Sequence, residues 1–236
     1  MRFVRGHQMH RRNQTEWAIW QLLDRGNLTS ASAPTSVVHT IRRLLDIDRQ
    51  LGADRQAPER WKRQFAFIDE TPQGRGAENG YSLENIVALW LGVQFLALGI
   101  PQAEAVRFLR ALKSELDRAV RRIHDDYAER IGTALLRKTD VAAALRRSEF
   151  VPVAHYVYVL TATVDHHGVL TAATRRRGST LSNICWSRED FLEFIETYVS
   201  RDKRLVILEL ANAVASLTYF LARAPEIKRG RTASGY

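Results

Sequence analysis

The stretch GYSLENIVALWLGVQFLALGIP, residues 80–101, decides how this chain folds. Ser82 stands where a helix can begin, because its hydroxyl can accept a hydrogen bond from a backbone amide of the first turn. Apolar side chains then fill nearly every position up to Leu98, which indicates a helix buried on all sides. Gly99 is a typical residue just past a helix end, and Pro101 suits the first turn of the next helix. The sequence therefore predicts a buried helix with defined ends.

A long amphipathic helix is predicted from Pro101 onward. Its apolar residues recur every three or four positions, and its other face carries many charged side chains. About four heptads of this pattern exceed the usual length of a globular helix, so self-association through the apolar face is one interpretation. Packing within the same chain is the alternative. The residues expected at a dimer contact are Leu109, Leu112, Leu116, Val120, Ile123 and Tyr127.

Two basic helices are predicted before the buried helix, and a short helix around residues 13–25 precedes them. Ser36 caps the first, over about 36–51, which carries Arg42 and Arg43. Pro58 starts the second, over about 58–65. A basic helix of this size can enter the major groove of DNA. The second helix carries Arg60, Lys62 and Arg63 on one turn.

A hairpin is predicted next, because residues 71–80 are rich in turn formers and short apolar stretches flank them. Phe65, Phe67 and Ile68 precede the turn, and Tyr81 follows it. Arg75 would lie at the tip. A basic hairpin after two helices has the form of a wing that contacts the DNA backbone or minor groove.

The C-terminal part changes to strands. Residues 153–164 are rich in β-branched and aromatic side chains, and residues 169–174 and 181–186 are expected to pair with them. Ser187 caps a helix, and a last helix is expected over about 205–222. The expected fold is α+β but mainly α. Its expected parts are a basic tail and short helix (1–35), a winged helix-turn-helix-like domain (36–100), a long linking helix (101–140), a small α+β module (150–225) and a basic tail (226–236).

Net charge is the strongest global signal. Lys and Arg total 35 against 26 acidic residues, which gives +9 at pH 7. Such a chain attracts polyanions such as nucleic acid. No apolar run is long enough to span a membrane, and no apolar leader follows the N-terminus. We therefore expect a cytoplasmic protein.

Catalytic and metal-binding patterns are weak. One cysteine, Cys185, excludes an internal disulfide and a multi-cysteine zinc site. The run Asp165-His166-His167 stands alone at an expected turn, and Gly74-Arg75-Gly76 is too short for a phosphate-binding loop. We therefore expect no catalytic residue, metal or cofactor, and no enzyme activity.

The order of these parts resembles that of MerR-like winged helix-turn-helix regulators over about residues 36–135. The run Gly80–Ile86 resembles the end of the wing in that family, and Leu98-Gly99-Ile100 resembles the turn between its next two helices. The long helix beyond Pro101 falls where the family has its antiparallel dimerisation helix. The resemblance implies a homodimer on a palindromic duplex site, with Arg60, Lys62 and Arg63 on the recognition helix and Arg75 and Tyr81 on the wing.

Our first functional hypothesis is thus a DNA-binding transcriptional regulator. The C-terminal module would bind a small-molecule effector or a partner, by analogy with such regulators only. Two alternatives stay open, namely a helical protein–protein adaptor and an architectural protein that binds any DNA sequence.

Overall fold

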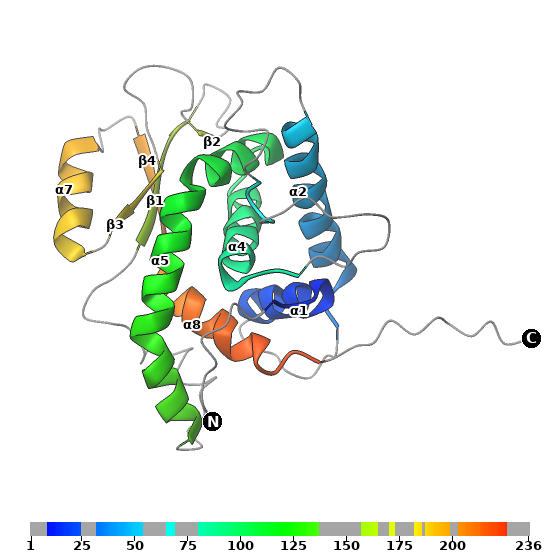
Figure 1. Ribbon diagram of the computed structural model, residues 1–236. Coiled ribbons are helices and arrows are strands. Elements are labelled where there is room, and N and C mark those ends of the chain that lie inside the picture. Colours follow the sequence, from blue (N-terminus) through cyan, green and yellow to red (C-terminus); the bar gives the residue numbers. More distant parts are fainter. Residues whose placement is uncertain are drawn as a thin grey trace, which may run out of the picture.

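The chain is described here from a computed structural model, which places residues 9–24, 32–53, 65–68, 80–136, 157–164, 170–172, 182–185, 187–198 and 203–225. This part is mainly helical, and one small antiparallel sheet lies beside the helices (Figure 1). The helices are α1 (Arg12–Leu23), α2 (Thr35–Ala53), α4 (Leu83–Ala97), α5 (Gln102–Leu136), α7 (Arg188–Tyr198) and α8 (Leu210–Leu221). The strands are β1 (Val157–Val164), β2 (Leu170–Ala172), β3 (Ser182–Cys185) and β4 (Lys203–Glu209).

Helix α4 is the centre of the helical core, as its composition predicts. It contacts α1, α2, α5 and α8, and its side chains from Ile86 to Leu91 are buried. The Asn85 backbone amide donates to the Ser82 hydroxyl at 3.3 Å, so Ser82 caps the helix. Gly99 has a φ of +82°, a backbone angle that residues with a Cβ atom rarely adopt. Both predicted ends of this helix are therefore confirmed.

Strand β1 is the middle of the sheet. Residues 157–160 pair with both β3 and β4, and residues 162–163 pair with both β2 and β4. Because a strand has two edges, β2 and β3 must lie end to end along one edge while β4 fills the other. The predicted return of the chain after residue 164 is confirmed, since Val164 pairs with Leu170.

Helices cover both faces of the sheet (Figure 1). Helices α5 and α8 contact β3 and β1 from the side of the helical core, and Ile184, Val206 and Leu208 point to that side. Helix α7 lies on the opposite face, where Cys185 interacts with Asp190. The Ser187 hydroxyl accepts from the Asp190 backbone amide at 3.0 Å, so the predicted cap of α7 is confirmed.

The last predicted helix begins later than expected. Residues 203–209 form β4, and only residues from Leu210 onward are helical. Pairing of residues 203–209 with β1 outweighs the helical spacing of the apolar residues. Glu209 then ends the strand and caps α8, because its carboxylate accepts from the Asn212 backbone amide at 3.1 Å.

Helix α8 packs into the helical core, although the sequence assigns it to a separate C-terminal module. It contacts α1, α4 and α5. The ring of Phe220 meets the ring of Trp17 edge-on, with centroids 6.3 Å apart. The two ends of the described chain thus share one apolar core, so residues 140–150 do not divide that core into an N-terminal and a C-terminal part.

Candidate nucleic-acid interface and the buried polar contacts behind it

Helix α2 presents a basic outer face. Its apolar side chains Ile41, Leu44 and Leu45 are buried, whereas Arg42 and Arg43 are exposed. Neither arginine forms an ion pair with another residue of the described part. Both guanidinium groups can therefore reach an anion in solvent.

The other face of α2 carries a buried ion pair. The Arg110 Nε donates to Asp48 Oδ1 at 2.6 Å, and both side chains are 1% exposed. Arg110 also donates to the Asp48 backbone carbonyl, and its guanidinium lies 5.5 Å from the centre of the Phe65 ring. Burial raises the pKa of the Asp48 carboxyl above its ordinary value, while the charge of Arg110 and hydrogen bonds from two backbone amides oppose that rise.

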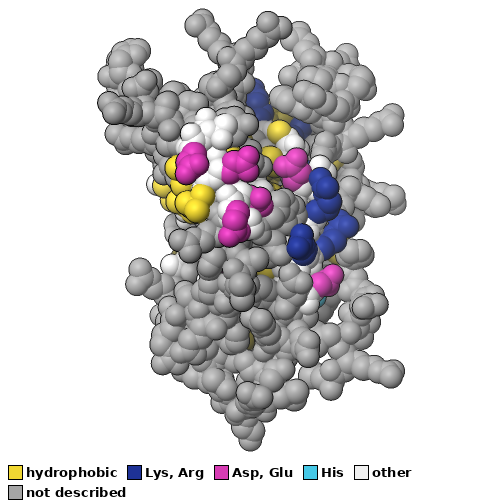
Figure 2. Space-filling model, turned by 90° about the vertical axis from the view of Figure 1, so that its left-hand side faces the viewer, with side chains coloured by type: hydrophobic (Ala, Val, Ile, Leu, Met, Phe, Trp, Pro, Cys, Tyr) yellow, Lys and Arg dark blue, Asp and Glu magenta, His cyan; other side chains and the backbone are white. Residues whose placement is uncertain are grey.

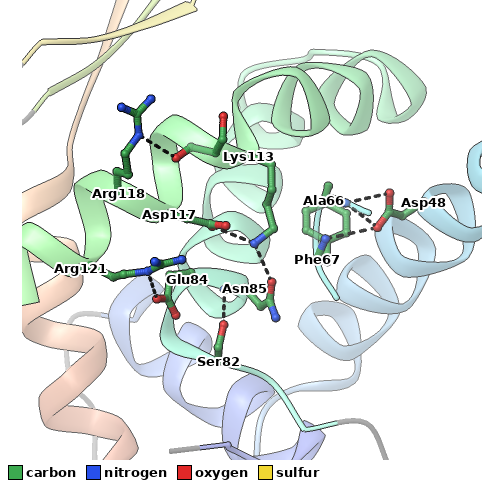
Figure 3. Close-up of polar contacts among 11 residues, drawn as sticks. Asp48, Ala66, Phe67, Ser82, Glu84, Asn85, Lys113, Asp117, Arg118 and Arg121 are labelled. Carbon is green, nitrogen blue, oxygen red and sulfur yellow. Dashed lines mark hydrogen bonds and ion pairs between the residues drawn. The ribbon is translucent and has the colours of Figure 1, made fainter. Parts of the chain in front are cut away.

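Those amides belong to the chain that returns after α2. The Ala66 and Phe67 amides donate to the Asp48 carboxylate at 3.0 and 3.2 Å (Figure 3). The chain leaves α2 at Ala53 and is held beside Asp48 again at Ala66. The described residues on the two sides of segment 54–64, Ala53 and Ala66, therefore lie at the same end of α2. Residues 54–64 contain four basic and two acidic residues.

The predicted recognition-helix and wing residues are placed only in part. Arg60, Lys62, Arg63 and Arg75 lie outside the described residues. Tyr81 is 3% exposed, so its side chain is not available to DNA on this surface.

Tyr81 also has a different backbone partner from the expected one. Its amide donates to the His10 carbonyl at 2.8 Å, and the His10 amide donates back at 2.9 Å. Phe67 and Ile68, which were expected to flank the hairpin, are buried and form no strand. His10, the partner of Tyr81, is itself buried, and this burial lowers the pKa of its imidazole.

A second group of polar contacts joins α4 to α5 (Figure 3). The Lys113 Nζ donates to Asn85 Oδ1 at 3.0 Å and to Asp117 Oδ1 at 2.7 Å. The Arg121 Nε donates to Glu84 Oε1 at 3.0 Å. Burial works to raise the pKa of Glu84, but hydrogen bonds from its own amide, from Ser82 and from Arg121 hold that pKa below its ordinary value.

The apolar face of α5 is covered by the same chain. Leu109, Leu112, Leu116, Val120 and Ile123 are all buried, and α5 contacts α2, α4 and α8. Tyr127 belongs to α5, but the structure does not describe its side chain. A second copy therefore cannot reach the five buried residues, and the expectation that they form a dimer contact is replaced by the alternative of packing within one chain.

Positive charge is unevenly distributed. On the face that Figure 2 shows, acidic side chains gather over α7, and a group of basic side chains lies to their right. The exposed acidic residues of α7 are Glu189, Asp190, Glu193 and Glu196.

Other kinds of site find little support among the described residues. No three or more His, Cys, Asp or Glu side chains there are arranged to hold a metal ion. Cys185 is buried, and burial together with the charge of Asp190 raises the pKa of its thiol to about 11. The run Asp165-His166-His167 lies outside the described residues. None of the helices that the structure describes is both long enough and apolar enough to cross a membrane.

Sequence reasoning missed the Asp48–Arg110 pair. The helical spacing of Ile41, Leu44, Leu45 and Asp48 indicates that Asp48 lies on the buried face of α2, and this could have been read from the sequence. Its partner stands 62 positions away, and no local pattern links the two. Comparison with known proteins adds no relative, since no family model, no curated protein and no solved structure matches this chain.

Proposed function

We propose that this protein is a duplex-DNA-binding regulator that contacts DNA through the outer face of α2 and the basic segment 54–64. One observation carries the proposal: Arg42 and Arg43 are exposed on the outer face of α2, and the Asp48 carboxylate of the same helix holds the chain at Ala66 and Phe67, just after the basic residues 54–64.

Charge supports this choice of surface. Phosphate contacts supply most of the affinity of DNA-binding proteins, and arginine forks suit phosphate oxygens and guanine edges. Arg42 and Arg43 add two exposed guanidinium groups on α2 itself. The acidic outer face of α7 would repel DNA, so that face would point away from the duplex.

The predicted wing contributes less to the proposal than residues 54–64. Residues 69–79 contain three acidic residues and a single basic one, Arg75. Tyr81 is buried. The resemblance to MerR-like regulators still supports two-fold binding to a palindromic site, which remains part of the proposal.

The test is titration of fluorescein-labelled duplexes, followed by anisotropy, with random duplex and with duplexes enriched by repeated selection. Three variants remove two positive charges each: R60Q/R63Q, R42Q/R43Q, and the control R107Q/R223Q. Arg107 is half-buried on α5, and Arg223 is exposed just after α8, where it lies over the ring of Tyr219. Each phosphate contact that is lost should reduce the slope of log affinity against log salt by about 0.9.

We expect R60Q/R63Q and R42Q/R43Q to bind more weakly and with a smaller salt slope, while R107Q/R223Q binds like the wild type. Equal losses in all three variants would mean that only net charge matters, which favours the architectural alternative. Wild-type protein without measurable affinity for any duplex would refute the proposal and favour the adaptor.

A further inference from the structure

Strand β4 has an edge with no described partner. Its other edge pairs with β1 along the whole strand. Lys203 lies opposite Thr163 at one end, and Glu209 lies opposite Val157 at the other. No described strand pairs with the edge that faces away from β1. A strand edge without a partner presents unpaired amides and carbonyls, and proteins commonly protect it with proline, a bulge or central charges. The sequence KRLVILE has no proline, and its charged residues stand only at the ends.

An apolar side chain is exposed on the same strand. Ile207 is 48% exposed, unlike Val206 and Leu208, which pack toward the core. The register places Ile207 on the face that also carries Cys185, which is the face that α7 covers. Leu192 of α7 is 46% exposed. Figure 2 shows hydrophobic side chains grouped beside the acidic ones on this side of the molecule.

The strand is complementary to itself when a second copy runs antiparallel to it. Centred on Val206, such a pairing sets Leu205 opposite Ile207 of the second copy and Arg204 opposite Leu208. It also sets Lys203 opposite Glu209, whose carboxylate in addition caps α8. The two Val206 residues then face each other on the two-fold axis. Aliphatic pairs directly across an antiparallel ladder stabilise it, and a two-fold contact requires that the strand be complementary to itself.

We propose that two copies of this chain form a homodimer through the outer edges of their β4 strands, which joins their sheets into one continuous sheet. The apolar face of α5, which is buried within each copy, takes no part in this contact. The inference does not depend on DNA binding, because oligomeric state is measured without DNA. A two-fold dimer would also match the palindromic site of the proposed function.

The first test is sedimentation equilibrium of the full chain. The wild type should show twice the 27.0 kDa chain mass. Changing Ile207→Lys should raise the dissociation constant of the dimer about tenfold or more, because the change occurs twice in a symmetric dimer. The matched control is Met9→Lys, which alters a similarly exposed apolar side chain (52% exposed) and should leave the constant unchanged.

The second test reads the register by disulfide formation with oxidised glutathione. Val206→Cys should give a covalent dimer, because residues directly opposite in an antiparallel pair have Cα atoms about 5 Å apart, within the reach of a disulfide. Lys203→Cys should not, because the two copies of residue 203 would be about 20 Å apart. The native Cys185 is buried and should not compete.

A monomeric wild type at the highest soluble concentration would overturn the proposal. So would a dimer in which Val206→Cys fails to cross-link, or in which Lys203→Cys cross-links equally well, because the contact would then lie elsewhere. Cross-linking at Val206 remains decisive even if Ile207→Lys does not fold.

Discussion

Changing Arg110→Met removes the guanidinium that faces the Asp48 carboxylate, while the side chain keeps most of its length and apolar stem. The carboxylate would stay buried and would keep its hydrogen bonds from the Ala66 and Phe67 amides, but it would lose its countercharge. Removing one partner of a buried ion pair costs about 3–5 kcal/mol. Both side chains are almost fully buried, so we expect a loss in this range.

This loss is large for a protein of 236 residues. Total unfolding free energies are about 5–15 kcal/mol. In proteins of this size each kcal/mol lowers the melting temperature by about 2–4 °C, so the variant should melt roughly 6–20 °C lower. Urea unfolding followed by tryptophan fluorescence measures the free-energy difference. The control is Arg118→Met on the same helix, where the side chain is exposed, and its effect should stay within about 0.5 kcal/mol.

The stability of the Arg110→Met variant should change with pH in a defined direction. The pKa of Asp48 is already raised in the folded protein by burial, and loss of the Arg110 charge removes an effect that opposes the rise. The folded variant then binds a proton more readily than the unfolded chain, so its stability falls as pH rises. The deficit relative to the wild type should shrink as pH falls from 7 toward about 4, near the ordinary pKa of Asp. A variant as stable as Arg118→Met at pH 7 would refute this reasoning.

Three further changes test the ends and the pairing of α4. Ser82→Ala should cost about 1 kcal/mol by removing the cap, whereas Ser114→Ala on the exposed face of α5 should cost much less, as compared by urea midpoints. Gly99→Ala should cost about 1 kcal/mol or more in the same assay, because φ is +82° there, and an unchanged midpoint would contradict that conformation. The folded pKa of Glu84 is lowered, so its stabilisation is present above its unfolded pKa and is lost as pH falls through its folded pKa. Glu84→Gln should therefore destabilise the protein at pH 7 and do so less as pH falls below the ordinary pKa of Glu, and equal losses across this range would exclude the ion pair with Arg121.

The buried polar contacts concern function as well as stability. The Asp48 carboxylate joins α2 to the chain that follows residues 54–64, so Arg110→Met should also weaken the anchorage of the proposed DNA-binding segment. Anisotropy at a temperature where the variant is folded would separate this effect from unfolding. Affinity equal to that of the wild type would show that the segment does not need this contact.

The local features of the fold were predictable because each depends on neighbours a few positions away. Ser82 and Ser187 cap helices through amides three residues later, and Gly99 adopts a backbone conformation that its missing side chain allows. The apolar period of α5 likewise predicted one long helix with a buried face. Such preferences can be read from a short window of sequence.

The parts that sequence reasoning missed depend on distant residues. Residues 205–209 have helical spacing, but the presence of β1 makes them a strand. The apolar face of α5 required a cover, and its period could not say whether a second copy or α4 and α8 would supply it. Tyr81 pairs with His10, a residue that the sequence places in a tail.

The sequence by itself therefore determined where α4 begins and ends, that α4 is buried, and that the chain carries a large positive charge. Only the tertiary structure decided that Asp48 meets Arg110, that α8 packs against α1, and that one edge of β4 has no described partner. The physical reason is that backbone preferences act over a few residues, whereas burial and ion pairing depend on which distant segments come together.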